Sequence, residues 1–352
     1  MHALPAALPA PRTLDPAAAP PYRWGVLGTG WIASRFVPAV QHNTRQRFVA
    51  IASRDTSRAE AFARAHGLPR WYGSYQQLVL DAEVDVVYVA TPHPAHLDCA
   101  RQALEAGKHV LVEKPLALNA AQAGEIARLA ADRGLFCMEA LWTFFLPRLD
   151  VVRQVLEAGW LGEVRTVAAE LGEHFTGEHR IMRLDLAGGP LLDLGTYPLA
   201  LTTWLLGRPE RVLALGQPHQ AGVNGQLAAI LADARGNLGI VHTTLLGVTP
   251  SAATIAGTRG TLFMPGVFCL PGDVVLTSID GKHRVTFTEP RTGHGALYFE
   301  AAEVARCIAA GLRESPLRRL ADSIVTLEAM DEIRRQVGIV FPGEGRAPWR
   351  AS

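Results

Sequence analysis

The feature that most constrains the fold is a glycine-containing loop that joins an apolar run to a helical segment. Residues 24–27 lead directly into Gly28-Thr29-Gly30-Trp31-Ile32-Ala33, which has the order G-x-G-x-x-A. In such a loop the first glycine permits a tight turn, the second lets the backbone approach a pyrophosphate, and the small last residue lets the helix pack on the strand. A plain strand-to-helix turn would not explain two glycines at this spacing. The loop therefore predicts a dinucleotide phosphate site at a helix N-terminus.

Around this loop, residues 22–145 alternate short apolar runs with helical stretches. The runs are almost continuously apolar, which is typical of parallel strands covered on both faces. Helix signals separate them: Ser57 and Glu60 have the spacing of a capping box, and Asn119 can cap a helix that ends at Gly134. The alternation predicts a doubly wound α/β domain. Its strands are expected at 24–27, 48–53, 84–90, 109–112 and 135–138.

Beyond residue 146 the chain shows strand-like runs separated by turn signals such as Arg235-Gly236-Asn237 and Asp280-Gly281. Turns of this kind connect antiparallel strands. Helices are expected at 149–158, 296–310 and 322–337. The second half is therefore predicted to be an α+β domain with a mainly antiparallel sheet. Its strands are expected at 163–173, 211–216, 227–232, 238–245, 252–256, 274–279 and 284–287.

The first 21 residues differ from the rest because they hold seven Ala and six Pro. They lack the basic start and the unbroken apolar run of a secretory signal. We interpret them as a flexible leader, and the alternative is an arm that embraces a partner subunit. The predicted organisation is a leader at 1–21, a dinucleotide-binding domain at 22–145 and a second domain at 146–352.

Composition excludes several classes of function. With 49% hydrophobic and 19% charged residues the chain can bury a sizeable core. A net charge of +1 without a Lys/Arg run argues against a nucleic-acid partner. The longest weakly polar stretch, 194–207, is too short to cross a bilayer. The four cysteines have no metal or disulfide spacing, and His174 and His179 lack a third ligand. We expect a cytoplasmic protein without a metal site or membrane contact.

The end of the second strand indicates which dinucleotide binds. An NAD site usually places a carboxylate there to bind the ribose 2′-hydroxyl. This chain has Ala52-Ser53-Arg54, with Arg58 one turn later. Ser53 can donate to a 2′-phosphate and Arg54 can pair with it, so NADP(H) is the expected cofactor. The alternative is that Arg54 is a solvated loop charge and Asp55 binds a ribose.

Two further clusters carry groups suited to proton transfer. Thr91-Pro92-His93 with His96, and Glu113-Lys114-Pro115, each follow a predicted strand, where ligands of such sheets bind. In the second half, Gly188–Tyr197 precedes an apolar helix. If Asp193 begins that helix, Asp193 and Tyr197 share one face.

These motifs resemble those of the glucose–fructose oxidoreductase and inositol dehydrogenase (Gfo/Idh/MocA) family, and within it the NADP-dependent dimeric dihydrodiol and D-xylose dehydrogenases. The resemblance covers about residues 22–342. It implies a Rossmann domain, a large open antiparallel sheet that carries the substrate site, and a homodimer or higher homo-oligomer. It rests on the loop at 28–33, Ser53-Arg54-Asp55, Thr91-Pro92-His93, Glu113-Lys114-Pro115, Glu139-Ala140-Leu141-Trp142, Leu191–Leu199 and Asp331–Gln336.

The resemblance makes Lys114 and Tyr197 the catalytic pair, with Asp193 fixing the substrate or the lysine. A neighbouring ammonium favours the phenolate of a tyrosine, which supports this assignment. The alternatives are a core role for Tyr197 and an ion pair of Lys114 with Glu113 or Asp193. An arginine common after the family's EALW segment is absent, because the run is Trp142-Thr143-Phe144-Phe145. Trp142, Phe144 and Phe175 could form an apolar wall for a substrate ring. The expected cofactor contacts are Gly28, Thr29, Gly30, Trp31, Ile32, Ser53, Arg54, Arg58, Thr91, Pro92, His93, His96, Glu113 and Lys114.

The leading interpretation is an NADP-dependent dehydrogenase or reductase that acts on a sugar, a cyclic diol or a related carbonyl compound. The family also contains redox-neutral enzymes with tightly bound cofactor and non-catalytic dinucleotide-binding regulators. A regulator would need neither Lys114 nor Tyr197, so their joint presence favours an enzyme.

Overall fold

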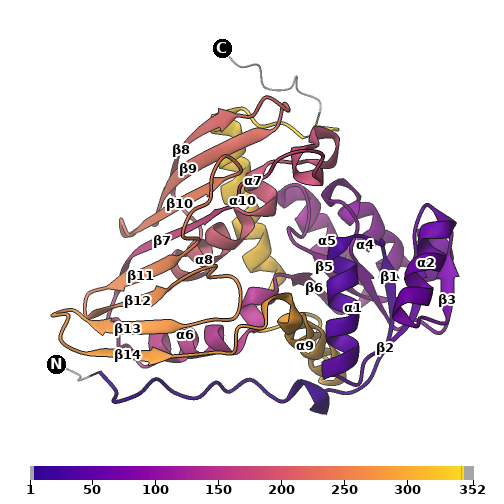
Figure 1. Ribbon diagram of the computed structural model, residues 1–352, viewed down its shortest axis with the longest axis horizontal. Helices are drawn as coiled ribbons and strands as arrows, with labels where there is room; N and C mark the ends of the chain where they lie inside the picture. The colour runs from indigo at the N-terminus through magenta and orange to yellow at the C-terminus, as the bar shows by residue number, and fades with distance from the viewer. Residues whose placement is uncertain (1–3, 342, 345–352) are drawn as a thin grey trace. The chain divides into compact units, whose positions relative to one another are not determined.

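The computed structural model describes residues 4–341, 343 and 344, and the chain divides into two compact units (Figure 1). We call residues 14–145 with 292–324 the Rossmann unit, and residues 1–13 with 146–291 and 325–352 the sheet unit. Residues 1–3 of the predicted leader and 345–352 of the predicted second domain lie outside the described residues. The domain limits given above stay a prediction.

The Rossmann unit contains a parallel six-stranded sheet in the order β3-β2-β1-β4-β5-β6, which confirms the predicted doubly wound α/β fold. The central strands are buried along nearly their full length, as their continuous apolar character requires. The strands are β1 (Arg23–Leu27), β2 (Arg47–Ala52), β3 (Arg70–Tyr72), β4 (Val86–Val89), β5 (His109–Glu113) and β6 (Cys137–Ala140).

Five helices connect these strands, and their termini follow local capping chemistry. Asn119 accepts from the backbone N–H of Gln122, and Gly67 and Gly134 end helices in the left-handed conformation. The expected capping box at Ser57 is wrong, because the Asp55 carboxylate two residues earlier accepts from the N–H groups of Ser57 and Arg58. The helices are α1 (Trp31–Asn43), α2 (Thr56–His66), α3 (Tyr75–Val79), α4 (His96–Glu105) and α5 (Ala120–Arg133).

A late segment of the chain completes the Rossmann unit. The 3-10 turn η6 (Gly293–Leu297) and the helix α9 (Tyr298–Ala309) both pack against α1. Ala302 and Ala305 of α9 form a small apolar cluster with Ala19, which follows the 3-10 turn η1. The 3-10 turn η1 (Pro16–Ala18) also lies against α9.

The sheet unit contains an eight-stranded sheet in the order β14-β13-β12-β11-β7-β10-β9-β8. All neighbouring pairs are antiparallel except β7 and β10, which run parallel, so the expectation of a mainly antiparallel sheet is confirmed. The strands are β7 (Val164–Gly172), β8 (Arg211–Pro218), β9 (Asn224–Ala232), β10 (Leu238–Thr244), β11 (Ala253–Gly257), β12 (Gly260–Met264), β13 (Val274–Ser278) and β14 (Arg284–Phe287).

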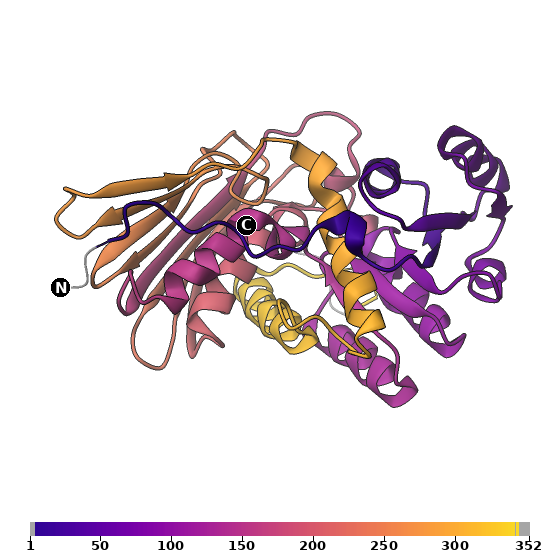
Figure 2. The same cartoon turned by 90° about the horizontal axis from the view of Figure 1, so that it is seen from below.

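Helices cover one face of this sheet, as Figure 2 shows. Leu149, Val152 and Val155 of α6 (Pro147–Glu157) pack with Val167 of β7 in one apolar core. The helix α8 (Thr196–Leu206) lies over β7 and β10. The last helix, α10 (Leu320–Val337), reaches β8 through Gln336, whose side chain donates to the carbonyl of Val212 at 2.7 Å.

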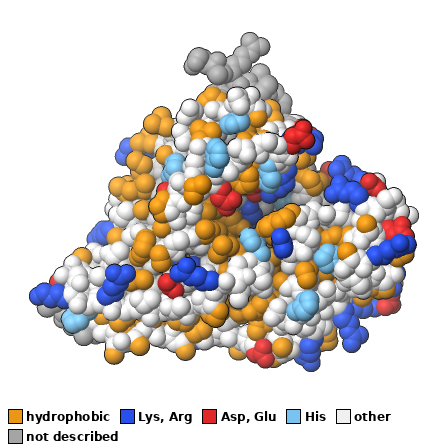
Figure 3. Space-filling view, in the orientation of Figure 1, with side chains coloured by type: hydrophobic (Ala, Val, Ile, Leu, Met, Phe, Trp, Pro, Cys, Tyr) orange, Lys and Arg blue, Asp and Glu red, His pale blue; other side chains and the backbone are white. Residues whose placement is uncertain are grey.

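The opposite face of β8, β9 and β10 carries exposed apolar side chains. Leu213 and Leu215 of β8 are 61% and 83% exposed, and their alternation with less exposed neighbours marks a strand with one open face. Orange side chains gather over these strands in Figure 3. We call this surface the open face, and it consists of Leu213, Leu215, Ile230, Leu238 and Ile240.

The predicted leader makes contacts in both units. In the sheet unit, Arg12 bridges Asp150 and Glu157 of α6 at 2.8 and 2.9 Å, and Leu4 and Leu8 pack against its core. In the Rossmann unit, Asp15 caps η1 by accepting from the N–H of Ala17. The flexibility of this segment stays a prediction.

Within the described residues, no helix combines the length and the apolar character that spanning a membrane would require.

Candidate cofactor and active site

The loop between β1 and α1 has the geometry of a phosphate cradle. Gly28 has φ of +103°, and a Cβ atom there would lie 2.5 Å from the carbonyl oxygen of Ala90. Gly30 is the N-cap of α1, and no side chain caps its N–H groups within the described chain. Unsatisfied N–H groups at a helix start bind anions, so Gly28, Thr29, Gly30, Trp31 and Ile32 fit a dinucleotide pyrophosphate.

The side chains after β2 include those named in the two alternatives for the ribose. Asp55 accepts from the N–H groups of Ser57 and Arg58 at 2.9 and 3.3 Å, so its Oδ1 caps α2. Ser53 is nearly buried, and its hydroxyl accepts from the N–H of Asp55 at 3.2 Å. The Arg54 side chain is hydrogen-bonded to the Tyr75 hydroxyl. Burial raises the pKa of that hydroxyl. One carboxylate oxygen of Asp55 is thus engaged in helix capping, next in the sequence to the guanidinium group of Arg54.

The turn after β4 is held from inside the unit. His96 is fully buried, and its Nδ1 and Nε2 lie 2.9 Å from the carbonyl oxygens of Pro115 and Thr91. The His93 ring meets the His96 ring edge to face at 5.6 Å. His96 therefore joins the Thr91-Pro92-His93 turn to the turn that follows β5, and it contacts protein atoms on both sides of its ring.

Carboxylates hold both ends of the Glu113-Lys114-Pro115 turn. Buried Glu113 accepts from the Tyr88 hydroxyl and from the N–H of Lys114, which precedes a cis Lys114–Pro115 bond. On the exit side, Glu139 of β6 accepts from the N–H of Leu116 at 2.9 Å. Glu139 is itself fixed by Ser323 at 2.5 Å and by buried Arg318 at 3.5 Å. The Lys114 backbone is thus positioned by two anchored side chains.

An aromatic cluster adjoins the phosphate loop. His294 of η6 stacks on Trp142 with ring centroids 5.3 Å apart, and its edge meets Trp31 at 4.8 Å. Burial lowers the pKa of His294, and the nearby charges of Arg35 and Lys114 lower it further. We call Trp31, Trp142 and His294 the aromatic corner. Its imidazole favours the neutral form and lies within electrostatic reach of Lys114.

Sequence reasoning missed His294, because a single histidine in a glycine-rich stretch carries no periodic or motif signal. Of the residues expected to form an apolar wall, Trp142 lies in the aromatic corner. Phe144 is buried in the same unit, where the Arg318 guanidinium lies 4.9 Å from its ring centroid. Phe175 is half-buried in the sheet unit, with its ring 4.7 Å from that of His179.

Asp193 and Tyr197 lie on two short helices rather than on one. Asp193 ends α7 (Pro190–Asp193), and Tyr197 is in the first turn of α8 after the N-cap Gly195. The expectation that Asp193 begins the helix is wrong, because α7 ends at Asp193 and α8 begins at Thr196. A Cβ at the N-cap Gly195 would lie 2.6 Å from the Leu191 carbonyl oxygen. Buried Asp193 accepts from Arg180 at 2.9 Å, a partner that the sequence analysis did not identify.

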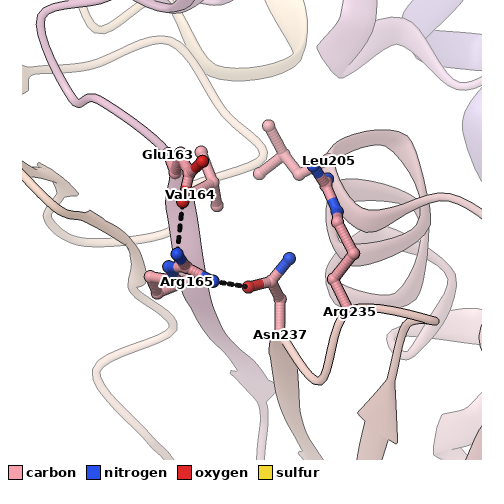
Figure 4. Close-up of a pocket in the computed structure, with 6 residues that line it drawn as sticks. All are labelled: Glu163, Val164, Arg165, Leu205, Arg235 and Asn237. Atoms are coloured by element: carbon pink, nitrogen blue, oxygen red, sulfur yellow. Dashed lines mark hydrogen bonds and ion pairs between the residues drawn. The ribbon is translucent and has the colours of Figure 1, made fainter.

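A separate pocket of about 350 Å³ opens in the sheet unit (Figure 4). Arg165 bridges its walls by donating to Glu163 and, at 3.3 Å, to Asn237. The pocket is lined by Leu205 at the C-terminal end of α8, whereas Tyr197 lies at the N-terminal end of that helix. None of the predicted site residues lines the pocket. Its lining residues are Glu163, Val164, Arg165, Leu205, Arg235 and Asn237.

The predicted site residues are therefore distributed over the two units. Lys114 and the cofactor loop belong to the Rossmann unit, whereas Asp193 and Tyr197 belong to the sheet unit. Within the described residues, no cluster of His, Cys, Asp and Glu is arranged to hold a metal ion.

Comparisons with known proteins agree with this division. Residues 22–141 match the oxidoreductase family with an NAD-binding Rossmann fold, and residues 150–263 match the GFO/IDH/MocA C-terminal domain. The chain is 36% identical to the trans-1,2-dihydrobenzene-1,2-diol dehydrogenase of Bos taurus, over 91% of this chain and 98% of that one. It is 35% identical to the Homo sapiens enzyme of the same name, over 92% and 99%.

Solved structures show the same architecture. KijD10, a 3-ketoreductase from Actinomadura kijaniata in complex with NADP and TDP-benzene, has a TM-score of 0.80 and 29% identity over 90% of this chain and 98% of that chain. A levoglucosan dehydrogenase has a TM-score of 0.82 at 20% identity, over 91% and 98%, and supports the fold alone. The chain therefore belongs to the Gfo/Idh/MocA family of NAD(P)-binding oxidoreductases, and it is an oxidoreductase that acts on CH–OH groups.

Proposed function

We propose that this protein is an NADP-dependent dehydrogenase or reductase in which Lys114 and Tyr197 carry the proton transfer. The observation that carries the proposal is the anchoring of the Lys114 turn by Glu113 and Glu139, in a chain that also retains Tyr197 after its glycine-rich segment. A dinucleotide-binding regulator would need neither a fixed lysine nor a tyrosine.

When bound, NADP(H) would supply or accept the hydride. Gly30 and the start of α1 would hold its pyrophosphate, because no side chain among the described residues caps the N–H groups there, and Gly28 would permit the tight turn before them. Ser53, Arg54 and Arg58 would hold a 2′-phosphate. The capping role of Asp55 supports this choice, because a free carboxylate would repel that phosphate.

Proton transfer would fall to Tyr197. A carbonyl that receives a hydride becomes an alkoxide and needs a proton, and oxidation needs the reverse. A phenol is a weak acid near neutral pH, and a neighbouring ammonium such as that of Lys114 favours its phenolate. Asp193, paired with Arg180, would position the substrate beside Tyr197.

The substrate class follows from the aromatic corner and from the relatives. Trp31 is 58% exposed beside the cofactor loop, and Trp142 and His294 extend the aromatic surface behind it. Flat apolar faces with one neutral imidazole suit a ring that carries hydroxyl or keto groups. Relatives are named for a cyclic trans-diol and for 3-ketoreduction. We therefore propose a cyclic diol, a sugar or the corresponding ketone.

We also propose a homodimer that forms through the open face, in the cytoplasm. Five large apolar side chains on adjacent strands make a contiguous surface of the kind that a partner subunit covers.

The direct test is a panel of trans-diols, sugars and ketones followed by NADPH absorbance, with NADP and NAD offered separately. Turnover of at least one ring compound, with kcat/KM higher for NADP than for NAD, is the expected result. No turnover of any member in either direction, together with intact cofactor binding, would favour a regulator instead.

A further inference from the structure

A further buried carboxyl group of the Rossmann unit has no role in the site described above. Glu300, in the first turn of α9, is fully buried, and neither of its carboxyl oxygens has a hydrogen-bond partner among the described residues. Buried polar groups almost always have a partner, and an ionised group without one is strongly destabilising. The side chain must therefore be accommodated in another way.

The charge that acts on Glu300 is that of Glu113, and it is negative. Tyr88 and Glu113 lie on the sheet face that α1 covers, since Phe36 of α1 stacks on the Tyr88 ring at 4.0 Å. α9 packs against α1, which brings Glu300 toward the same face.

Within the described residues, the elements that pack against α9 bring no cation that acts on Glu300. Among the elements that pack against α9, α1 carries Arg35 and His42, and η6 carries His294. Arg35 lies over the Trp31 ring, and His42 bonds to the Pro38 carbonyl of its own helix. The described residues of η1 and of η3 (Trp142–Phe145) carry no ionisable side chain. None of these groups acts on Glu300.

The hydrogen bonds decide which carboxyl of the pair holds a proton. Glu113 accepts from the Tyr88 hydroxyl and from the Lys114 N–H, and both bonds favour its charged form. Glu300 receives no such bond from the described residues, and burial followed by the charge of Glu113 raises its pKa well above the usual range. Two buried carboxyl groups that act on each other oppose ionisation of both at once.

We propose that Glu300 is a positioning residue that stays a neutral carboxylic acid, so that of these two carboxyl groups only Glu113, which holds the Lys114 N–H, carries negative charge. An ionised Glu300 would repel Glu113 and weaken its bond to the Lys114 N–H. The kinetic part of this inference rests on the proposed role of Lys114, whereas the protonation state does not.

Infrared spectroscopy of the full chain tests the protonation state directly. A neutral carboxylic acid has a carbonyl band apart from the bands of carboxylates. At about pH 8.5 that band should be present in the wild type and lost in Glu300→Gln. This pH is roughly 1.5 units above the pKa of about 7 that burial gives Glu289, so Glu289 is then mostly ionised.

Glu303→Gln is the matched control on the same helix. Glu303 is also buried, but it accepts from the Ser315 hydroxyl at 2.6 Å and lies 3.5 Å from Arg306. Its substitution should leave the band in place. A wild type without the band, or a band that persists in Glu300→Gln, overturns the proposal.

A pH titration covers the case in which Glu300→Gln fails to fold. In Glu113→Gln the carboxylic acid band should disappear at a lower pH than it does in the wild type, because the neighbouring charge that opposes the ionisation of Glu300 is gone. An unchanged midpoint would show that the two carboxyl groups do not interact and would overturn the pairing.

The pH dependence of turnover distinguishes a positioning role of Glu300 from a purely structural one. The ratio of kcat in Glu300→Gln to kcat in the wild type should rise with pH once Glu300 begins to ionise, by up to about tenfold per pH unit for one titrating group. A ratio independent of pH contradicts the positioning role. If Lys114→Met keeps full turnover, the proposed function is wrong. The protonation state of Glu300 is still tested independently by the infrared measurement.

Discussion

The two units solve the problem of covering a sheet in different ways. In the Rossmann unit every residue of β4 is buried, and the polar groups that matter lie where strands end. In the sheet unit β8 alternates exposed and less exposed residues, because helices cover only one face. In the first arrangement the polar groups lie at turns that buried side chains of the same unit hold in place. The second leaves a broad apolar surface available for association.

The largest expected loss comes from filling the cradle of the Rossmann unit. Gly28→Ala combines a φ of +103° with a Cβ placed 2.5 Å from backbone, so we expect about 3 kcal/mol of lost unfolding free energy and little NADP binding. Gly67→Ala is the control, because its φ of +71° is strained but its surroundings are open, and it should cost about 1 kcal/mol. Denaturant titration measures the free energy of unfolding and cofactor fluorescence measures NADP binding. Equal effects of the two substitutions would contradict the view that the turn after β1 is more tightly constrained than an ordinary helix end.

Buried carboxyl groups give each unit a different dependence of stability on pH. Glu289 of the sheet unit lies beside Arg148, whose N–H donates to it at 3.2 Å, and burial raises its pKa to about 7. Glu300 faces an anion instead. A carboxyl with a raised folded pKa stabilises fully below its unfolded pKa, and that stability is lost as pH rises toward the folded value.

Substitution by glutamine removes this loss. The free energy of unfolding of Glu289→Gln relative to the wild type should therefore rise between about pH 5 and pH 7 and then level off, by roughly 1–3 kcal/mol in total. The advantage of Glu300→Gln should continue to grow above pH 7. Thermal unfolding across this range measures both, and two identical curves would contradict the assignment of different surroundings.

The cofactor corner should respond more modestly. Arg54→Ala removes one charge-assisted contact and should raise the KM for NADP about 10- to 100-fold, with little change for NAD. Arg64→Ala on α2, the helix that follows Arg54, is the control, because Arg64 pairs with Glu60 at 2.5 Å. Equal effects of Arg54→Ala on both cofactors would remove the argument for NADP.

The open face should show the smallest effect on folding. Leu215 is 83% exposed, so Leu215→Lys should change unfolding free energy by no more than about 0.5 kcal/mol while it dissociates the proposed dimer. Leu80→Lys, at a 68% exposed position of the Rossmann unit, should leave the assembly intact. Light scattering at micromolar concentration distinguishes the two, and a wild type that is already monomeric would contradict the role of this face.

The sequence predicted most of the Rossmann unit because local chemistry and the fold agree there. Continuous apolar runs mark buried strands, and Asn119 and Gly134 mark helix ends. The short edge strand β3 was missed, since three residues with partly exposed side chains make no such run. β12 was missed in the sheet unit, where Gly260 begins the strand and Phe263 faces outward.

Only part of the candidate site could be predicted from the sequence. Motifs identified the cofactor loop and the Glu113-Lys114-Pro115 turn, because neighbouring residues form them. The contacts of His294 with Trp31 and Trp142, and the pairing of Asp193 with Arg180, join segments that the sequence does not connect by spacing. Glu300 looks like an ordinary helix residue until its burial is known.

The turnover of Tyr197→Phe tests the central claim most directly, since it removes one hydroxyl from the sheet unit and leaves the cofactor loop untouched. With the best substrate of the panel and saturating NADP(H), we expect kcat to fall about 10²- to 10⁴-fold while the cofactor dissociation constant stays the same. Near-full turnover would contradict the account. Tyr197 would then be a core residue, and the proton donor would have to be sought elsewhere, with His93 as the next candidate.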